Sequence, residues 1–422
     1  MVRVIAPEAL ILADHIRPGE TLCWGQAAAE PLTLTEALSA QRHDLGGVKA
    51  FTGIGWGRIT DPAHADAIRF TSYCGTGRNR LLRDAGALDI LPVHYSAFEP
   101  ALARRVDVLL LQLAPGRRPG SYSFGLACEY LWPLVASARL VIAEVNDQVP
   151  STPASVTINE DDIDILVPTS RPVPEPPRAI ADPTQTRIAA HVAGLIPDGA
   201  VLQVGLGALP AAILDCLDGH RNLGVHSGLF VDGFTRLIEK GVIDNSRKIL
   251  APGISVAGLI AGTAITHRLC HRSDVVRLAP TSQTHALSIL AGIKGFTAIN
   301  SALEVDLTGQ VNAEEIDGRY VGAVGGGTDF ARGAAAAKSG LPIIALPSAR
   351  RGRDGSLVSS IVPALNGPVS LARADAGVIV TEEGVADLRG ASLSERVERL
   401  IAISHPELRE TLTAHARQQY LL

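Results

Sequence analysis

Short apolar runs alternate with longer segments of mixed polarity along most of the chain. Before residue 171 the pattern predicts strands at 48–51, 106–113 and 140–145, and helices at 32–41, 99–105 and 126–138. Buried runs separated by helices are typical of a parallel sheet covered by helices. The glycine-rich segments 53–57 and 75–77 follow expected strands, where such sheets bind ligands, although turn formation alone would also explain them.

A proline-rich segment divides this pattern in two. Residues 171–186 hold five prolines and cannot continue a helix or a central strand, so we expect an extended linker there. A chain of 422 residues is also too long for one typical core. We therefore predict an N-terminal domain at 1–170 and a C-terminal domain at 187–422.

The alternation resumes after the linker. The pattern predicts strands at 200–204, 248–250, 296–299, 343–346, 361–362 and 377–381, and helices at 186–195, 211–217, 392–403 and 406–420. The turn at 205–210 leads from a strand into a helix, so its backbone amides suit a phosphate or pyrophosphate group. In the stretch 222–233, a strand that ends in His226, Ser227 and Gly228 would expose chemistry at a sheet edge, before a turn at Asp232 and Gly233.

Composition and charge narrow the classes of function. The formal net charge of -5 and the dispersed basic residues give no footprint for nucleic acid or for an anionic membrane. The apolar runs have the length of strands, far below the roughly 20 residues that span a bilayer. Glu8 and Asp14 near the N-terminus argue against a secretory signal. Five cysteines without a close pair predict reduced, mostly buried thiols and a cytoplasmic location.

One histidine pair has a spacing that could ligate a metal. His267 and His271 are four residues apart with Cys270 between them, which would place both imidazoles on one face of a helix. No third ligand pattern accompanies them, and the chain has no HExxH motif. We therefore expect an ordinary helix face there and no metal.

Six longer stretches carry a family resemblance. They are LVIAEVNDQ at 140–148, QVGLGALP at 203–210, NSALEVDLTGQVNAE at 300–314, GGGTDFARGA at 325–334, TEEGVADLRG at 381–390 and SHPELR at 404–409. In this order they resemble the acetyl-CoA hydrolase/transferase family, which contains the 4-hydroxybutyrate, butyrate and succinate CoA-transferases. The resemblance implies two α/β domains of the CoA-transferase (NagB/RpiA) type with parallel or mixed sheets. It also implies a homodimer or higher homo-oligomer.

The resemblance further implies which residues bind coenzyme A. It also shows positions at which this chain differs from the family. The glycines expected to cradle coenzyme A are present, as is Asp329; they are Gly205, Gly207, Gly325 and Gly326. In the family a glutamate in a His-Ser/Thr-Glu segment attacks the acyl-CoA and forms an acyl-glutamyl anhydride and then a glutamyl-CoA thioester. Here that position is Gly228, which has no side chain to react. The family's asparagine near the reacting carbonyl falls at or next to His285, and Glu383 stands where a tyrosine is usual.

Three functions stay open on this basis. The main hypothesis is an enzyme that consumes an acyl-CoA without a covalent glutamyl intermediate, by hydrolysis or by transfer to a small nucleophile. His285 or His226 would act as a base near neutral pH, and the backbone amides of Gly325 and Gly326 would hold the oxyanion. Ser227 is a weaker nucleophile candidate because it lacks a GxSxG elbow.

The second hypothesis is an ordinary CoA-transferase that uses a displaced carboxylate, with Glu304, Glu383 and Asp232 as candidates. Glu304 and Asp306 share one face of an expected strand, where a structural role is the simpler interpretation. The third hypothesis is a non-catalytic acyl-CoA-binding or partner protein. In each case coenzyme A or its thioester is a ligand that comes and goes, and no permanent cofactor is expected.

Overall fold

The computed structural model describes residues 2–177, 180–352 and 354–419, which form two compact units. Among these residues, unit 1 comprises 2–177, 228–232 and 254–284, and unit 2 comprises 180–227, 233–253 and 285–419. Two segments that follow the proline-rich region in the sequence therefore pack with the N-terminal part of the chain. The composition of the sequence gives no sign of this exchange.

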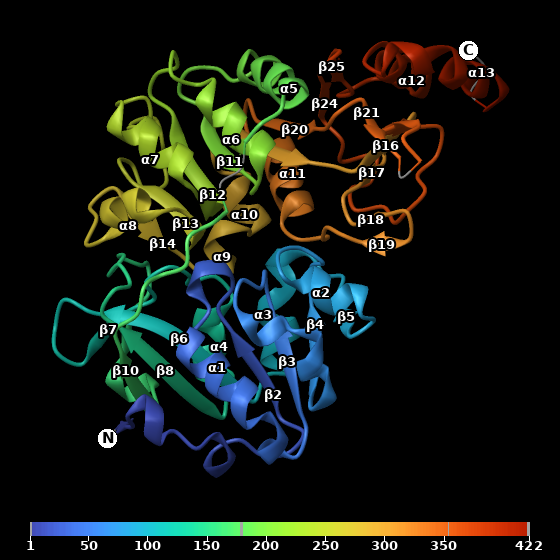
Figure 1. Cartoon of the computed structure of the whole chain (residues 1–422). Helices are drawn as coiled ribbons and strands as arrows, with labels where there is room; N and C mark the ends of the chain where they lie inside the picture. The colour runs from blue at the N-terminus through green and yellow to red at the C-terminus, as the bar shows by residue number, and fades with distance from the viewer. Residues whose placement is uncertain (1, 178–179, 353, 420–422) are drawn as a thin grey trace. The chain divides into compact units, whose positions relative to one another are not determined.

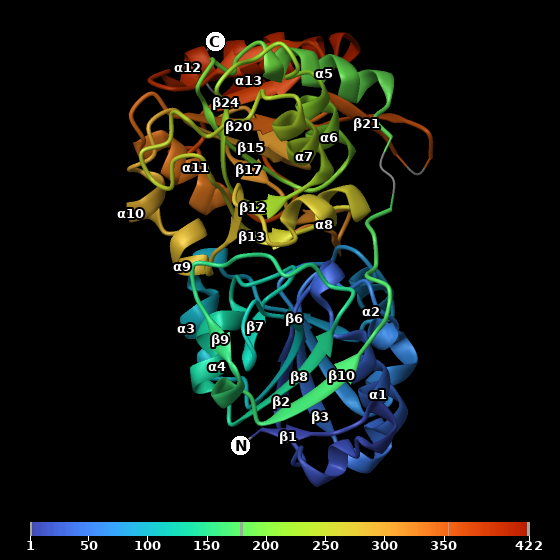
Figure 2. The same cartoon turned by 90° about the vertical axis from the view of Figure 1, so that its left-hand side faces the viewer.

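A parallel sheet forms the centre of unit 1. Its strands lie in the order β1 (Arg3–Val4), β10 (Ile165–Thr169), β8 (Leu140–Asn146), β6 (Val108–Pro115), β2 (Thr21–Trp24), β3 (Val48–Thr52), β4 (Ile68–Ser72) and β5 (Leu88–Ile90). Strands β6, β8 and β10 can be followed side by side in Figure 2. From β2 the chain proceeds outward through β3, β4 and β5, and it then returns to β6 on the other side of β2. The carboxyl ends of β2 and β6 are therefore the topological switch point of this sheet.

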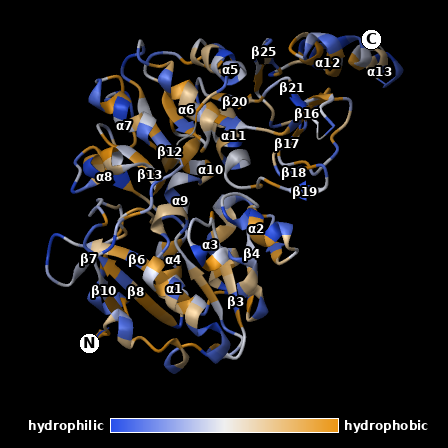
Figure 3. Ribbon diagram, in the orientation of Figure 1, coloured by the Kyte–Doolittle hydropathy of each residue, from blue (hydrophilic) through white to orange (hydrophobic). Residues whose placement is uncertain are grey.

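Helices and short strands complete unit 1. The helices are α1 (Leu32–Gln41), α2 (Asn79–Asp84), α3 (Phe98–Ala103), α4 (Leu131–Ser137), α8 (Ala264–Cys270) and α9 (Thr281–Thr284). The additional strands are β7 (Ser121–Ser123), β9 (Ile158–Asn159), β13 (Ser255–Ile260) and β14 (Val276–Leu278). Strand β6 is apolar except at Gln112 and β8 except at Glu144 and Asn146, in line with their mainly orange colour in Figure 3, and seven of the eight β6 residues are buried. A strand that is buried on both faces needs such a mainly apolar pattern.

The predicted helix at 126–138 is wrong in its first half, because α4 begins only at Leu131. The preceding residues are extended and pair with β13, where the Cys128 amide donates to the Gly258 carbonyl over 3.0 Å and the Ile260 amide donates to the Leu126 carbonyl over 2.7 Å. Apolar periodicity alone does not separate a short buried strand from a helix. The difference decides where Glu129 lies.

A second parallel sheet forms the centre of unit 2 (Figure 1). It includes β12 (Gly224–Phe230), β11 (Val201–Val204), β15 (Phe296–Ser301), β20 (Leu341–Ala345), β24 (Val378–Thr381) and the antiparallel edge strand β25 (Gly384–Asp387). Its helices are α5 (Pro183–Ala193), α6 (Ala208–Asp215), α7 (Asp232–Glu239), α10 (Leu287–Leu290), α11 (Gly327–Ala336), α12 (Leu393–Ala402) and α13 (Arg409–Gln419). The predicted α/β class with two parallel-sheet domains is thus confirmed.

Small sheets accompany the main sheet of unit 2. One contains β16 (Glu304–Asp306), β17 (Val311–Asn312) and β23 (Ile361–Val362). The others are the pairs β18 (Glu315–Ile316) with β19 (Arg319–Tyr320) and β21 (Ala349–Arg351) with β22 (Leu357–Ser359). The predicted helix at 406–420 opens with a 3-10 turn before α13, and its last predicted residue, Tyr420, lies outside the described residues.

Two further predictions of local structure are wrong. The expected linker at 171–186 extends too far, because α5 already begins at Pro183. Residues 178–179 of this segment lie outside the described residues. Proline is tolerated at the first helical position, and the side chain of Asp182 caps the helix by accepting from the Gln185 amide over 2.8 Å. The segment 248–250 is not a strand. The buried Lys248 ammonium donates to the Val225 carbonyl over 2.7 Å, while Ile249 is 79% exposed.

The structure also describes the five cysteines and the lengths of the helices. All five cysteines are free, and four of them are buried, while Cys216 is exposed. Within the part of the chain that the structure describes, we find no helix with both the length and the apolarity needed to cross a bilayer.

Candidate active site

The stretch around His226 is a buried strand and not an exposed edge. Strand β12 continues through Gly228 to Phe230, and Asp232 opens helix α7, so the predicted turn at Asp232 is wrong. His226 and Ser227 are 1% and 0% exposed. The Ser227 hydroxyl donates to the Val204 carbonyl over 3.5 Å, and the His226 ring meets Phe296 edge-on at 6.4 Å between centroids.

His285 is also packed inside unit 2. It follows α9, it is 4% exposed, and its ring lies 4.4 Å from that of Phe330. Burial, assisted by the neighbouring His226, lowers the pKa of His285 to about 3. The premise that His285 titrates near neutral pH is therefore wrong. Its imidazole stays neutral at physiological pH and is a weak proton acceptor.

One glycine turn follows the carboxyl end of β11, and the other precedes α11 close to the end of the neighbouring β15, where a Cβ on Gly327 would lie 4.0 Å from the Asn300 Cγ. After β11, Gly207 has a φ of +134°, and before α11, Gly325 has a φ of +51°, conformations that favour glycine. A Cβ on Gly205 would meet nothing within 4 Å, so packing does not require glycine there. A Cβ on Gly326, in contrast, would lie 2.7 Å from the His285 ring.

Each of the two turns leads into a helix, and the two helices begin near the carboxyl ends of β11 and β15. Helix α6 follows Gly207, and α11 follows Gly326 with Asp329 in its first turn. Between them, Asn300 at the end of β15 exchanges amide hydrogen bonds of 3.0 and 3.2 Å with Gln203 on β11. Backbone amides at two helix starts are groups that suit a phosphate or diphosphate.

The carboxylates singled out in the sequence have structural partners. Glu304 accepts from the Asn366 amide and side chain over 3.2 and 3.0 Å, and Asp306 accepts from the Thr308 hydroxyl over 2.7 Å. The other two carboxylates are held by contacts to one oxygen each.

Asp232 accepts from the Thr263 amide over 2.8 Å and from the Thr266 hydroxyl over 2.6 Å. Glu383 forms an ion pair of 3.6 Å with Arg409. Both oxygens of Glu304 and of Asp306 accept hydrogen bonds, whereas the bonds to Asp232 reach its Oδ1 and the ion pair of Glu383 reaches its Oε2. Glu304 and Asp306 are therefore the poorer candidates for a reacting group.

A buried glutamate that the sequence analysis missed lies in unit 1. Glu129 is 2% exposed, and its Oε2 accepts from the Tyr95 hydroxyl over 2.5 Å. The Gln26 side-chain amide donates to Oε1 over 2.9 Å and to Oε2 over 3.1 Å. Burial raises the pKa of Glu129 to about 7, although the bonds from Tyr95 and Gln26 lower it. A lone glutamate in the apolar segment 124–134 is the sequence signal that could have revealed it.

The amide orientation of Gln26 is fixed by its other partners. Its Oε1 accepts from the Ile54 amide over 2.9 Å and from the Tyr73 hydroxyl over 2.8 Å, so Nε2 must point to Glu129. Ile54 belongs to the glycine-rich segment 53–57, which follows β3. That segment therefore supports the buried carboxyl group.

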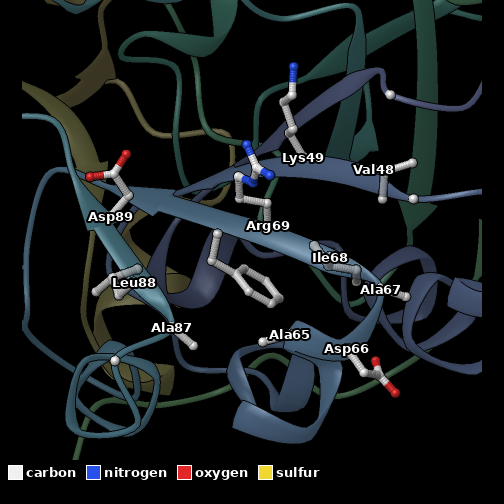
Figure 4. A pocket seen from close by; sticks show the side chains of 14 residues that line it. Val48, Lys49, Ala65, Asp66, Ala67, Ile68, Arg69, Ala87, Leu88 and Asp89 are labelled. Atoms are coloured by element: carbon white, nitrogen blue, oxygen red, sulfur yellow. The ribbon is translucent and has the colours of Figure 1, made fainter.

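A cavity of about 700 Å³ in unit 1 is a poor alternative for the chemistry. Figure 4 shows Lys49, Arg69 and Asp89 beside it, on strands β3, β4 and β5. Its lining also includes Gly47 and Ala67, which precede β3 and β4. The cavity thus lies at the amino ends of the strands, whereas parallel sheets bind ligands at the carboxyl ends.

The histidine pair was examined for further metal ligands close by. No group of three or more candidate ligands occurs in residues 2–177, 180–352 and 354–419. His267 lies on α8, and the His271 Nδ1 accepts from the Ser151 amide over 3.2 Å.

Comparison with known proteins finds relatives that match nearly the whole chain. The model of the acetyl-CoA hydrolase/transferase N-terminal domain matches residues 3–181, and the model of the C-terminal domain matches residues 262–416. The 4-hydroxybutyrate coenzyme A transferase of Clostridium kluyveri is 34% identical over 431 residues, with 99% of each chain covered. RipA from Yersinia pestis superimposes with a TM-score of 0.93 at 31% identity, over 100% of this chain and 98% of that one. The 4-hydroxybutyrate CoA-transferase of Porphyromonas gingivalis has a TM-score of 0.81 at 30% identity, over 99% and 98%.

Proposed function

Because the chain belongs to the acetyl-CoA hydrolase/transferase family, we propose that it transfers coenzyme A from an acyl-CoA to a free carboxylic acid. The observation that carries the proposal is the likeness, over 99% of the chain, to a 4-hydroxybutyrate CoA-transferase. An acyl-CoA and a carboxylate are accordingly the two substrates. The identity of the acyl group follows from neither the sequence nor the fold.

The state of His285 favours this function over attack by a water molecule or an amine. A general base is most effective when its pKa lies near the working pH, and the pKa of His285 is about 3. The side chain of His226 is also buried, with an exposed fraction of 1%. Transfer between carboxylates needs no base, because the acceptor is already ionised at neutral pH.

Coenzyme A would be held through its phosphates. The amides at the starts of α6 and α11 supply positive dipole ends, and Gly205 offers bare backbone to an approaching ligand. Gly207 and Gly325 permit the turns that aim these amides. In this proposal Asp329 supports the start of α11.

The reaction is a double displacement on an enzyme carboxylate. The carboxylate oxygen attacks the thioester carbonyl, the C–S bond breaks, and the thiolate of coenzyme A leaves behind a mixed anhydride. The thiolate then attacks the enzyme's own carbonyl, which releases the donor acid and leaves an enzyme thioester. The acceptor acid repeats both steps in reverse and leaves as its CoA thioester. Gly228 cannot supply this carboxylate, so another residue must.

A substrate panel tests the proposed function. The purified protein is incubated with acetyl-, butyryl-, succinyl- and 4-hydroxybutyryl-CoA, with and without acetate, and the CoA species are followed by mass spectrometry. We expect acetyl-CoA to form from at least one of the other donors, only when acetate is present, with ping-pong kinetics. Free coenzyme A that accumulates equally without acetate would indicate a hydrolase instead. Binding without turnover would indicate a non-catalytic acyl-CoA-binding protein, and either result contradicts the proposal.

A further inference from the structure

Glu129 and Gln26 lie where an open parallel sheet is expected to bind its ligand. Gln26 follows strand β2 by two residues, and β2 and β6 flank the topological switch point of unit 1. The crevice outside the carboxyl ends of such strands is the usual ligand site of this architecture. The cluster of Gln26, Tyr95 and Glu129 therefore occupies a functional position by topology alone.

The hydrogen bonds around Glu129 leave one of its oxygens available. Among the described residues, Oε2 accepts two bonds, from Tyr95 and Gln26, whereas Oε1 accepts one, the 2.9 Å bond from Gln26. A carboxylate has about four acceptor positions, so Oε1 keeps a lone pair that none of the described residues uses. The donors hold the group in one orientation, which lowers the entropy cost of an attack.

Glu129 also lies beside the strand position where a carboxylate is missing. A Cβ built on Gly258 would lie 3.3 Å from the Gly228 carbonyl oxygen and 3.5 Å from the Glu129 Cβ. The stem of Glu129 and the backbone of Gly228 are thus both within 3.5 Å of one point, and residues 228 and 258 bring no side chain to it.

We propose that Glu129 is the catalytic carboxylate of this protein, which takes over the role that residue 228 cannot fill. The inference rests on the proposed CoA transfer. Glu129 Oε1 attacks the thioester carbonyl and expels the thiolate of coenzyme A, which then attacks the Glu129 Cδ. That step breaks the anhydride C–O bond, releases the donor carboxylate and leaves coenzyme A on Glu129 as a thioester.

The surroundings of Glu129 suit such an intermediate. The carboxyl group is 2% exposed, and burial keeps water from an anhydride or thioester that would otherwise be hydrolysed. When the thiolate attacks the Glu129 Cδ, the negative charge develops on Oε2, to which the Tyr95 hydroxyl and the Gln26 amide donate. A carboxylate in an apolar site is also a stronger nucleophile once it is ionised, because its basicity is higher.

The test locates the thioester on the protein. The full-length protein is incubated with the donor acyl-CoA that is active in the panel, without acceptor, and is then reduced with sodium borohydride, which converts a glutamyl thioester to a primary alcohol. Peptide mass spectrometry identifies the modified residue. The variants are Glu129→Gln, Glu129→Asp and the control Glu144→Gln. Glu144 is another buried carboxylate of unit 1, which accepts from the Thr33 amide over 2.8 Å.

We expect the reduced side chain at Glu129 in the wild type and in Glu144→Gln, and its loss in Glu129→Gln together with a loss of transfer of about 10³-fold or more. In Glu129→Asp the alcohol should form at residue 129 more slowly, which keeps the test valid if Glu129→Gln does not fold. Transfer with the alcohol on another carboxylate would overturn the assignment and leave the proposed function intact. A wild type that transfers no coenzyme A would contradict the function itself.

Discussion

Replacement of His285 by phenylalanine should change how the stability of the protein depends on pH. In the folded chain the pKa of His285 is lowered to about 3, whereas an unfolded imidazole titrates near 6.5. Below pH 6.5 the unfolded chain therefore binds a proton that the folded chain does not. His285 thus contributes stability that is present at neutral pH and is lost as the pH falls toward 3.

The size of the effect follows from this difference. Between about pH 7.5 and about pH 5 the wild type should lose about 2 kcal/mol of unfolding free energy through His285 alone. Phenylalanine keeps the ring contact with Phe330, which is 4.4 Å away, but cannot bind the proton. Glu129 acts in the opposite sense, because its raised pKa of about 7 contributes stability at low pH that is lost as the pH rises. The difference between the two proteins, and not the wild-type curve, is therefore the quantity to measure.

Urea denaturation, followed by circular dichroism across this pH range, gives the comparison. We expect the stability of His285→Phe to decline less than that of the wild type between about pH 7.5 and about pH 5, by about 2 kcal/mol. His191→Gln, a change at an exposed position on α5, should follow the wild type. Parallel curves for the wild type and His285→Phe would refute the neutral, buried histidine.

Two further changes test the glycine turns and the glutamate cluster. Gly326→Ala should destabilise the fold by about 1–3 kcal/mol, because the new Cβ would lie 2.7 Å from the His285 ring, and the matched Gly205→Ala, with open space at its Cβ, should change thermal stability little. Tyr95→Phe removes the 2.5 Å bond that lowers the pKa of Glu129, so the midpoint of the rise of kcat/KM with pH should move above about 7. An unchanged pH midpoint of kcat/KM in Tyr95→Phe would show that ionisation of Glu129 does not control the reaction.

The hydrophobic pattern of the sequence correctly predicted helices and strands whose formation depends on neighbouring residues in the chain. Helix α1 has the predicted bounds 32–41, and strands β6 and β8 are mainly apolar runs of the kind that a buried sheet requires. The predicted secondary structure is wrong at 126–129 and 248–250, because contacts with residues far away in the chain determine the conformation there. The first segment pairs with β13, and the second is held by the buried Lys248.

The candidate site was harder to predict than the fold. The glycine turn at 205–210 could be recognised because a turn into a helix has a local composition, whereas Gly325 and Gly326 were named only by the family resemblance. The weakness of His285 as a base could not, because it results from burial by residues far away in the sequence. Glu129 also escaped detection, since its partners Gln26 and Tyr95 lie 103 and 34 residues away along the chain.

The most direct measurement follows heavy oxygen from the acceptor acid into the protein. The enzyme turns over its donor acyl-CoA with acetate that is labelled in both oxygens, and the digested protein is examined by mass spectrometry. A double displacement leaves one acetate oxygen on the enzyme carboxylate after each complete cycle, so the account predicts the label in the peptide that contains Glu129. Label that reaches the released donor acid while the protein stays unlabelled would show direct transfer between the substrates and contradict the account.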